Sequence, residues 1–259
     1  MKKSVILTLM VALCIYGCEK GSTGPSGPTG PAGPTVPTYQ MTFENGVYPD
    51  SGYSGIDTHW VNGSNQSTAP GTGEIQVGTG ATTANVQLGL FRANLSYKFP
   101  SNATVTGAYL QLTTETTSTL ASGTTYVFGV HSIINICAPG NCPWDDSANW
   151  LQVYPDFGAV GWTGGSSGPI TPGVDYNSTP LSTVTVTPSQ VNGNQVPLAW
   201  NLPVSVVQPW TNPANSGVIY GLCISSEPET GNGSGYISFW DNTGTAEYKP
   251  QVIVSYTIP

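Results

Sequence analysis

Short runs in which hydrophobic and polar side chains alternate recur along the chain from about residue 88 to its end. In Thr104–Thr114, Ala108, Leu110 and Leu112 would share one face of an extended chain. Successive side chains of a strand point to opposite faces, so this alternation predicts strands with one buried face. The strands predicted in this way are Leu88–Phe99, Thr104–Thr114, Thr124–Ile133, Leu181–Thr187, Val196–Leu202, Gly217–Ser225, Gly235–Trp240 and Gln251–Tyr256.

Glycine, proline and asparagine separate these runs, and no segment after residue 39 has a convincing helical period longer than two turns. Many short strands with such breaks predict an all-β fold, a β-sandwich or jelly roll. One exception is Pro203–Trp210, where proline suits the first turn of a helix and Asn201 is placed to cap it. Another is Cys137–Thr179, an aromatic and irregular stretch of a length that is usually functional or elaborately packed.

The first residues have the layout of an export signal. Lys2 and Lys3 precede an apolar run, residues 4–15, that is too short to span a bilayer. The run ends in Gly17-Cys18, and a small residue before a cysteine at this point resembles the lipobox of bacterial lipoproteins. The resemblance implies that residues 1–17 are removed and that Cys18 carries lipid, which would anchor the exported protein at the bacterial outer membrane or cell surface. The alternative is an ordinary secretory signal with a chance cysteine.

A collagen-like repeat follows the cysteine. We therefore predict that residues 18–38 consist of the lipid-anchor cysteine and a spacer. Glycine stands at positions 21, 24, 27, 30 and 33, and proline follows four of these five glycines. Five triplets offer few interchain hydrogen bonds for a triple helix, whereas a single chain of this composition favours extended polyproline II. We therefore expect a monomer held away from the membrane, with a trimer through this tract as the alternative.

Residues 39–259 remain for one sizeable β-sandwich domain, and their chemistry limits the partners. The whole chain has 6 basic and 14 acidic residues and a net charge of −8. Loss of Lys2 and Lys3 with the signal takes this charge to about −10, since nothing acidic leaves with them. Few cations remain to neutralise phosphates, so nucleic acid is not an expected partner.

The cysteines fit an oxidising compartment. Cys137 and Cys142 flank Pro-Gly-Asn, a turn sequence, and a disulfide across so short a turn is geometrically reasonable. Metal binding by this pair is the alternative interpretation, but a zinc site needs two further Cys or His ligands and the sequence has none nearby. Cys223 lies in an apolar run and is predicted to be a buried free thiol.

Several motifs, in order, resemble the DNRLRE domain of bacterial surface proteins. Residues 88–112 look like its core, a strand with Arg92-Ala93-Asn94-Leu95-Ser96 where the family has Arg-Phe-Asp-Leu-Ser, followed by an Ala-x-Leu-x-Leu strand. Asp57-Thr58 resembles the opening Asp-Thr of that family, and residues 204–222 and 250–256 are similar to its last blocks. The resemblance covers residues 43–256 and implies a jelly-roll β-sandwich related to carbohydrate-binding modules.

Sugar binding needs aromatic ring faces with amide or carboxylate partners, and 7 Trp and 13 Tyr supply the rings. Trp144, Trp150, Trp162 and Trp210 match family positions and are expected to be structural. The aromatic residues expected to be exposed, and therefore the candidate ligand-binding set, are Trp60, Tyr154, Tyr176 and Trp240. The family resemblance also makes Asp57 a candidate for structural Ca²⁺; no other cofactor is expected.

An enzyme would need a convergent set of titratable groups, and the sequence offers little. His131 lies on a predicted strand and is expected to be packed, and His59 has no accompanying serine or cysteine motif. We therefore predict a non-catalytic surface protein that binds glycan or extracellular polysaccharide. The alternatives are a structural or adhesive surface protein without a sugar site and, less favoured, a polysaccharide-cleaving enzyme.

Overall fold

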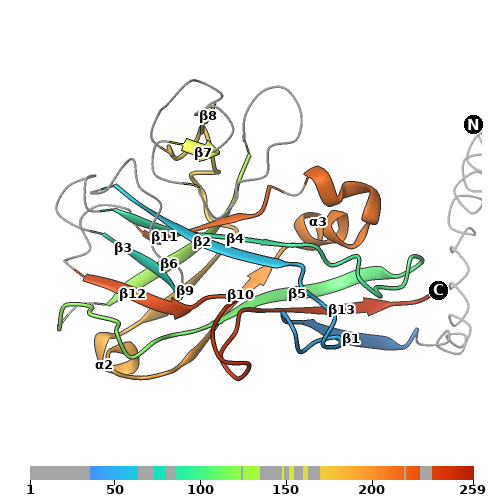
Figure 1. The fold of residues 1–259 in the computed structure, drawn as a ribbon, viewed down its shortest axis with the longest axis horizontal. Helices are drawn as coiled ribbons and strands as arrows, with labels where there is room; N and C mark the ends of the chain where they lie inside the picture. The colour runs from blue at the N-terminus through green and yellow to red at the C-terminus, as the bar shows by residue number, and fades with distance from the viewer. Residues whose placement is uncertain are drawn as a thin grey trace, which may run out of the picture. The chain divides into compact units, whose positions relative to one another are not determined.

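The strands form two main antiparallel sheets packed face to face, as Figure 1 shows for the computed structural model. The structure describes residues 36–63, 73–79, 86–123, 125–134, 148, 152–154, 160–162, 170–218, 220–227 and 235–259. These residues belong to one compact unit, Val36–Pro259. The prediction of an all-β sandwich is therefore confirmed.

One sheet has four strands and the other has seven. The four-stranded sheet has the order β1 (Thr38–Phe43), β13 (Gln251–Thr257), β5 (Thr104–Thr113) and β10 (Pro197–Leu202). The larger sheet has the order β12 (Gly235–Trp240), β3 (Glu74–Thr79), β4 (Gln87–Ala93), β11 (Leu222–Glu227), β6 (Tyr126–Ser132) and β9 (Ser182–Val186), and β2 (Ile56–Asn62) also pairs with β4. A separate short pair joins β7 (Gln152–Tyr154) to β8 (Val160–Gly161).

Every strand predicted from the alternation is present; Gly235–Trp240 has the predicted bounds, and each of the others is shifted at one or both ends. The first predicted strand ends early, at Ala93, because the chain turns after it and Lys98 adopts a left-handed backbone with φ 54°. Three strands at the beginning of the domain, β1, β2 and β3, were not predicted. In β2 the four consecutive residues 58–61 are buried, so the strand has no exposed polar side to alternate with an apolar side.

Within the described residues, the connections between strands include four short helical segments: α2 (Pro188–Val191), α3 (Val204–Val207), η3 (Gln208–Thr211) and η4 (Pro213–Val218). The helical turn predicted at Pro203–Trp210 is confirmed by α3 and η3. The predicted cap is wrong, because Asn201 lies in β10, paired with Tyr109, and is exposed. Pro203 occupies the N-cap position and makes no side-chain cap hydrogen bond.

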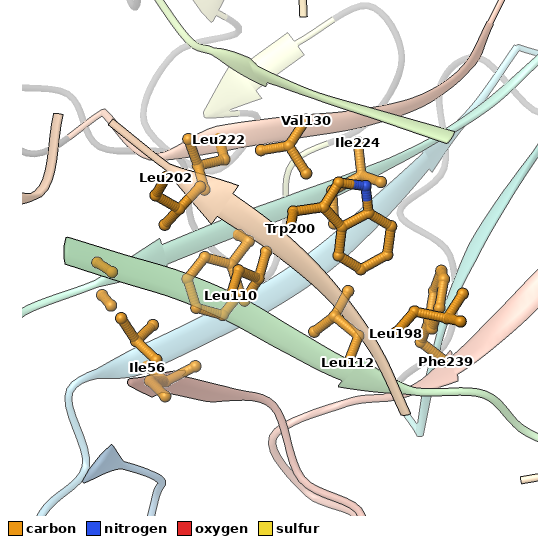
Figure 2. Packing of buried hydrophobic residues seen from close by; sticks show 14 of the residues in the cluster. Ile56, Leu110, Leu112, Val130, Leu198, Trp200, Leu202, Leu222, Ile224 and Phe239 are labelled. Carbon is orange, nitrogen blue, oxygen red and sulfur yellow. The ribbon is translucent and has the colours of Figure 1, made fainter. Parts of the chain in front are cut away.

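Side chains from both sheets meet in one core, part of which is drawn in Figure 2. Leu110 and Leu112 of β5 enter it from one sheet and Ile224 of β11 from the other, and all three are fully buried. Trp200 of β10 lies among them, and its indole Nε1 donates to the carbonyl oxygen of Phe128 in β6 at 2.9 Å. Each large apolar side chain buried in this way stabilises the fold by about 1.5–3 kcal/mol.

The outer face of the seven-stranded sheet carries a second buried cluster. Leu88 and Leu90 of β4 belong to it, whereas Phe91 belongs to the core between the sheets. Trp162 and Tyr176, from the segment that follows β6, are buried in this second cluster. The middle of the larger sheet is therefore covered on both faces, which accounts for the burial of successive residues in the middle of β2.

Candidate functional site

Two of the aromatic residues expected to bind sugar are buried, so the prediction of their exposure is wrong. Trp60 is only 9% exposed, because its position in β2 directs it into the core between the sheets. Tyr176 is 1% exposed, because it lies in the second cluster and its ring packs edge-on against His131, with ring centroids 5.4 Å apart. Neither ring offers a face to a polymer in solution.

The other predicted site residues have different positions. Trp240, at the end of β12, is half-buried, and its ring stacks on Tyr248 with centroids 5.7 Å apart and an interplanar angle of 23°. The side chain of Tyr154 lies outside the described residues, and so do Cys18, Cys137, Cys142, Trp144 and Trp150. Trp162 and Trp210 are buried, as expected of structural residues, and Cys223 is a buried free cysteine.

Asp57, the candidate calcium ligand, is held by an arginine. Asp57 of β2 and Arg92 of β4 are paired across the sheet, and the guanidinium Nε lies 2.6 Å from the carboxylate Oδ2. Among the described ranges, no group of three or more His, Cys, Asp or Glu side chains is arranged to hold a metal ion. Calcium binding at Asp57 stays a prediction of the sequence.

His131, Ser225 and Glu227 form a largely buried polar cluster. The Nε2 of His131 lies 2.7 Å from Oε1 of Glu227 and 2.9 Å from Oγ of Ser225, and its Nδ1 lies 2.7 Å from the carbonyl oxygen of Asn177. A carbonyl oxygen only accepts, so Nδ1 carries a proton and donates to Asn177. Burial by itself would raise the pKa of Glu227, but hydrogen bonds from His131 and Ser225 outweigh it and hold this pKa below its ordinary value.

This cluster does not have the geometry of a nucleophilic relay. In a Ser-His-acid triad the serine and the acid meet opposite nitrogens of the imidazole. Here Ser225 and Glu227 meet the same nitrogen, and a backbone carbonyl occupies the other. The cluster instead links β6 to β11 by side-chain hydrogen bonds, as expected for a packed His131.

A more open site lies where the loop between β1 and β2 meets the turn after β4. We call it the Tyr97 site; its residues are Asp50, Gly52, Tyr53, Ser54, Gly55, Asn94, Tyr97 and Lys98. Tyr97 is 37% exposed, and its hydroxyl donates to Oδ1 of Asp50 at 3.1 Å. Lys98 pairs with the other oxygen of Asp50, and its Nζ lies 5.5 Å from the centre of the Tyr97 ring. The site therefore joins an exposed ring to a carboxylate and an ammonium group.

Local hydrogen bonds hold the two loops together. The buried Tyr53 donates its hydroxyl to the carbonyl oxygen of Asn94 at 3.0 Å, and the Asn94 N–H donates to the carbonyl of Gly55 at 2.8 Å. A Cβ on Gly55 would lie 2.7 Å from Asn94 O and 2.8 Å from the Tyr53 ring, so only glycine fits there. Asp50 also accepts the Gly52 N–H at 2.8 Å, which orders the loop beside Tyr97.

Charge and shape both suit a polar ligand. The hydrogen bond from Lys98, then that from the Gly52 N–H, hold the pKa of Asp50 below its ordinary value, so Asp50 is an acceptor near neutral pH. Beside it lies a pocket of about 350 Å³, lined by Gly52, Tyr53, Ser54, Gly55, Asn94 and Tyr97. Pockets that take small ligands have volumes of about 300–1,000 Å³. The site thus offers an aromatic surface, a carboxylate and a concave wall at one place.

No family model matches the chain, and no curated protein matches it. The likeness to the DNRLRE domain therefore remains a resemblance of motifs. Within the described ranges, no helix has the length and apolar character that a membrane-spanning segment requires.

The Tyr97 site was not predicted from the sequence, because Asp50 and Tyr97 lie 47 residues apart along the chain. Tyr97 was also expected to belong to a strand that in fact ends at Ala93. Two local signals were available. Asp50-Ser51-Gly52 is a typical turn sequence. Lys98 is one of few cations in the chain, so an ion pair between it and a carboxylate of another loop could have been considered.

Proposed function

We propose that this protein is a non-catalytic, lipid-anchored cell-surface protein whose β-sandwich domain binds extracellular polysaccharide. The observation that carries the proposal is the Tyr97 site, where an exposed ring, the Asp50 carboxylate and a pocket of about 350 Å³ adjoin. Sugar rings pack their C–H faces on aromatic rings, while their hydroxyls donate to carboxylates and amides. The export signal and Gly-Pro-X spacer would present this domain at the membrane surface, with Cys18 as the lipid attachment.

Affinity electrophoresis tests the binding. The full chain and the Tyr97→Ala variant are run through native gels with and without embedded neutral and acidic polysaccharides, in calcium and in EDTA. The proposal expects at least one polymer to retard the wild-type chain and the variant to migrate faster in that gel. Equal retardation of both proteins would contradict a role for Tyr97. A dependence on calcium would support a site for that ion.

A second experiment tests the anchor separately. Membrane fractionation of cells that make the wild-type chain or Cys18→Ala should find the wild type in the membrane fraction. The variant should be released or accumulate as unprocessed precursor. A wild type that is soluble and cleaved elsewhere would contradict the lipoprotein proposal.

One observation favours the structural or adhesive alternative. β1 is an edge strand of the four-stranded sheet, its sequence TYQMTF has no charged residue, and Thr38, Tyr39 and Gln40 are exposed. Edge strands without charges can pair with strands of other chains. Concentration-dependent association of the wild type in sedimentation, abolished by Gln40→Lys, would support this role; a monomer at all concentrations would count against it.

A further inference from the structure

Two further pockets adjoin across the helical segment between β10 and β11, the orange α3 region of Figure 1. One has a volume of about 320 Å³ and reaches Ser132 and Tyr220. The other has a volume of about 450 Å³ and reaches Ser101 in the turn before β5. Pro209 and Asn215 line both, so the two pockets are neighbours with a shared wall, and we call the two together the groove.

None of the described residues that line the groove has a charged side chain. Its apolar walls come from the prolines Pro100, Pro209 and Pro213 and from the half-buried Tyr220, while the buried Trp210 closes the wall behind them. Apolar ring surfaces of this kind can pack against the C–H faces of pyranose rings. A charged ligand would find no counter-ion among these side chains, and the negative net charge of the chain disfavours anions further.

The groove has side-chain donors and acceptors that make no hydrogen bond with other described residues. The Asn212 side chain accepts the Ala214 N–H through Oδ1 at 3.0 Å, and within the described residues its Nδ2 has no partner. The exposed hydroxyl of Ser101 likewise has no partner in that part of the chain. The Asn215 amide donates to Pro209 O at 3.1 Å, which leaves its Oδ1 as an acceptor on the shared wall. Amides and hydroxyls placed in this way can donate to and accept from sugar hydroxyls.

We propose that this groove is a second binding site, specific for a neutral, hydroxyl-rich ligand, namely a short stretch of uncharged oligosaccharide that crosses Pro209 and Asn215. The proposal rests on the proposed function only in taking carbohydrate as the ligand. The two sites have different residues and differ in charge, since the Tyr97 site carries Asp50 and Lys98. Binding in the groove is therefore expected to be insensitive to salt.

Calorimetric titration of the full chain in detergent tests the groove, with cellohexaose, laminarihexaose and xylohexaose as probes. The double variant Ser101→Ala/Asn212→Asp removes both unpartnered donors and keeps the Oδ1 bond to Ala214. Ser122→Ala is the matched control, because that exposed serine lines a different pocket. Tyr97→Ala reports on the first site, and thermal unfolding of every variant confirms that it is folded.

The groove proposal expects at least one hexasaccharide to bind, with an affinity about tenfold lower in the double variant and unchanged in Ser122→Ala and Tyr97→Ala. It is overturned if none of the three probes binds, or if the double variant binds as the wild type does. If no hexasaccharide binds in the groove but Tyr97→Ala loses its retardation in gels, the groove proposal is wrong and the proposed function is still supported. If the double variant loses its retardation in gels and Tyr97→Ala keeps it, the groove and not the Tyr97 site binds the polysaccharide.

Discussion

The indole Nε1 of Trp200 donates to the carbonyl oxygen of Phe128 at 2.9 Å, and this bond joins the four-stranded sheet to the seven-stranded sheet. Trp200 is fully buried, and its ring also meets Phe239 of β12 edge-on, with centroids 5.9 Å apart. A single side chain of β10 therefore contacts two strands of the opposite sheet, and the packing of the sandwich depends on it.

We expect Trp200→Phe to lower the free energy of unfolding by about 1–3 kcal/mol, because it removes the donor and part of the ring. Trp200→Ala should cost more, about 3–5 kcal/mol, since it also opens a cavity. Urea unfolding followed by circular dichroism measures both changes. A Trp200→Phe variant as stable as the wild type would show that the bond between the sheets contributes nothing.

The carboxyl of Asp175 gives the fold a dependence on pH. It is fully buried, its Oδ2 accepts the Thr171 N–H at 2.7 Å, and its Oδ1 has no partner among the described residues. Burial raises the pKa of Asp175 to about 6, although the Thr171 N–H works in the opposite direction. A raised pKa means that the folded state binds the proton more tightly than the unfolded state does.

The stability that this proton provides is therefore complete below the unfolded pKa, near 4, and is lost as the pH rises through about 6. We expect the wild-type free energy of unfolding to fall between these two values more steeply than that of Asp175→Asn, which cannot ionise. Urea unfolding at a series of pH values measures the two slopes. Equal slopes for the two proteins would contradict a buried, protonated Asp175.

Thiol chemistry tests the cysteine assignments. Cys223 is completely buried, and burial followed by the nearby Glu227 charge raises the pKa of its thiol. It should not react with a thiol reagent in the native protein but should react on unfolding. If Cys137 and Cys142 form the predicted disulfide and Cys18 carries lipid, the denatured and unreduced protein should titrate as one thiol. Three reactive thiols would contradict the disulfide.

Sequence patterning predicted the sandwich well where a strand has one buried and one polar face. In β5, Leu110 and Leu112 are buried and Gln111 between them is half-exposed, so the alternation is visible in the sequence. The same reasoning failed for β2, because a second layer that includes Tyr176 covers the outer face of the larger sheet. No local pattern reveals such a layer, and this is also why Tyr176 was taken for an exposed residue. Trp60 was taken for exposed because β2 itself was not predicted, although its ring lies in the core between the sheets.

The site was harder to predict than the fold, since it depends on a contact between loops. Asp50 and Tyr97 meet only because Tyr53 and Gly55 dock on the backbone of Asn94, and that docking is a property of the folded chain. Sequence composition did indicate the chemistry: few charges, many amides and hydroxyls, and abundant aromatic residues. It could not say which aromatic residue is accessible.

The most direct test of polysaccharide binding at the Tyr97 site is a calorimetric titration of the full chain with the polymer that retards it in gels. The wild type, Tyr97→Phe, Tyr97→Ala and, as control, Tyr39→Ala are compared at equal folded stability; Tyr39 is an exposed tyrosine on β1, 45% accessible. We predict weak binding per site, roughly 10⁻³ to 10⁻⁵ M, retained in Tyr97→Phe and Tyr39→Ala and lost at the Tyr97 site in Tyr97→Ala, so that any binding left in this variant belongs to the groove. Undiminished affinity in Tyr97→Ala, or no polymer that binds the wild type, would contradict it.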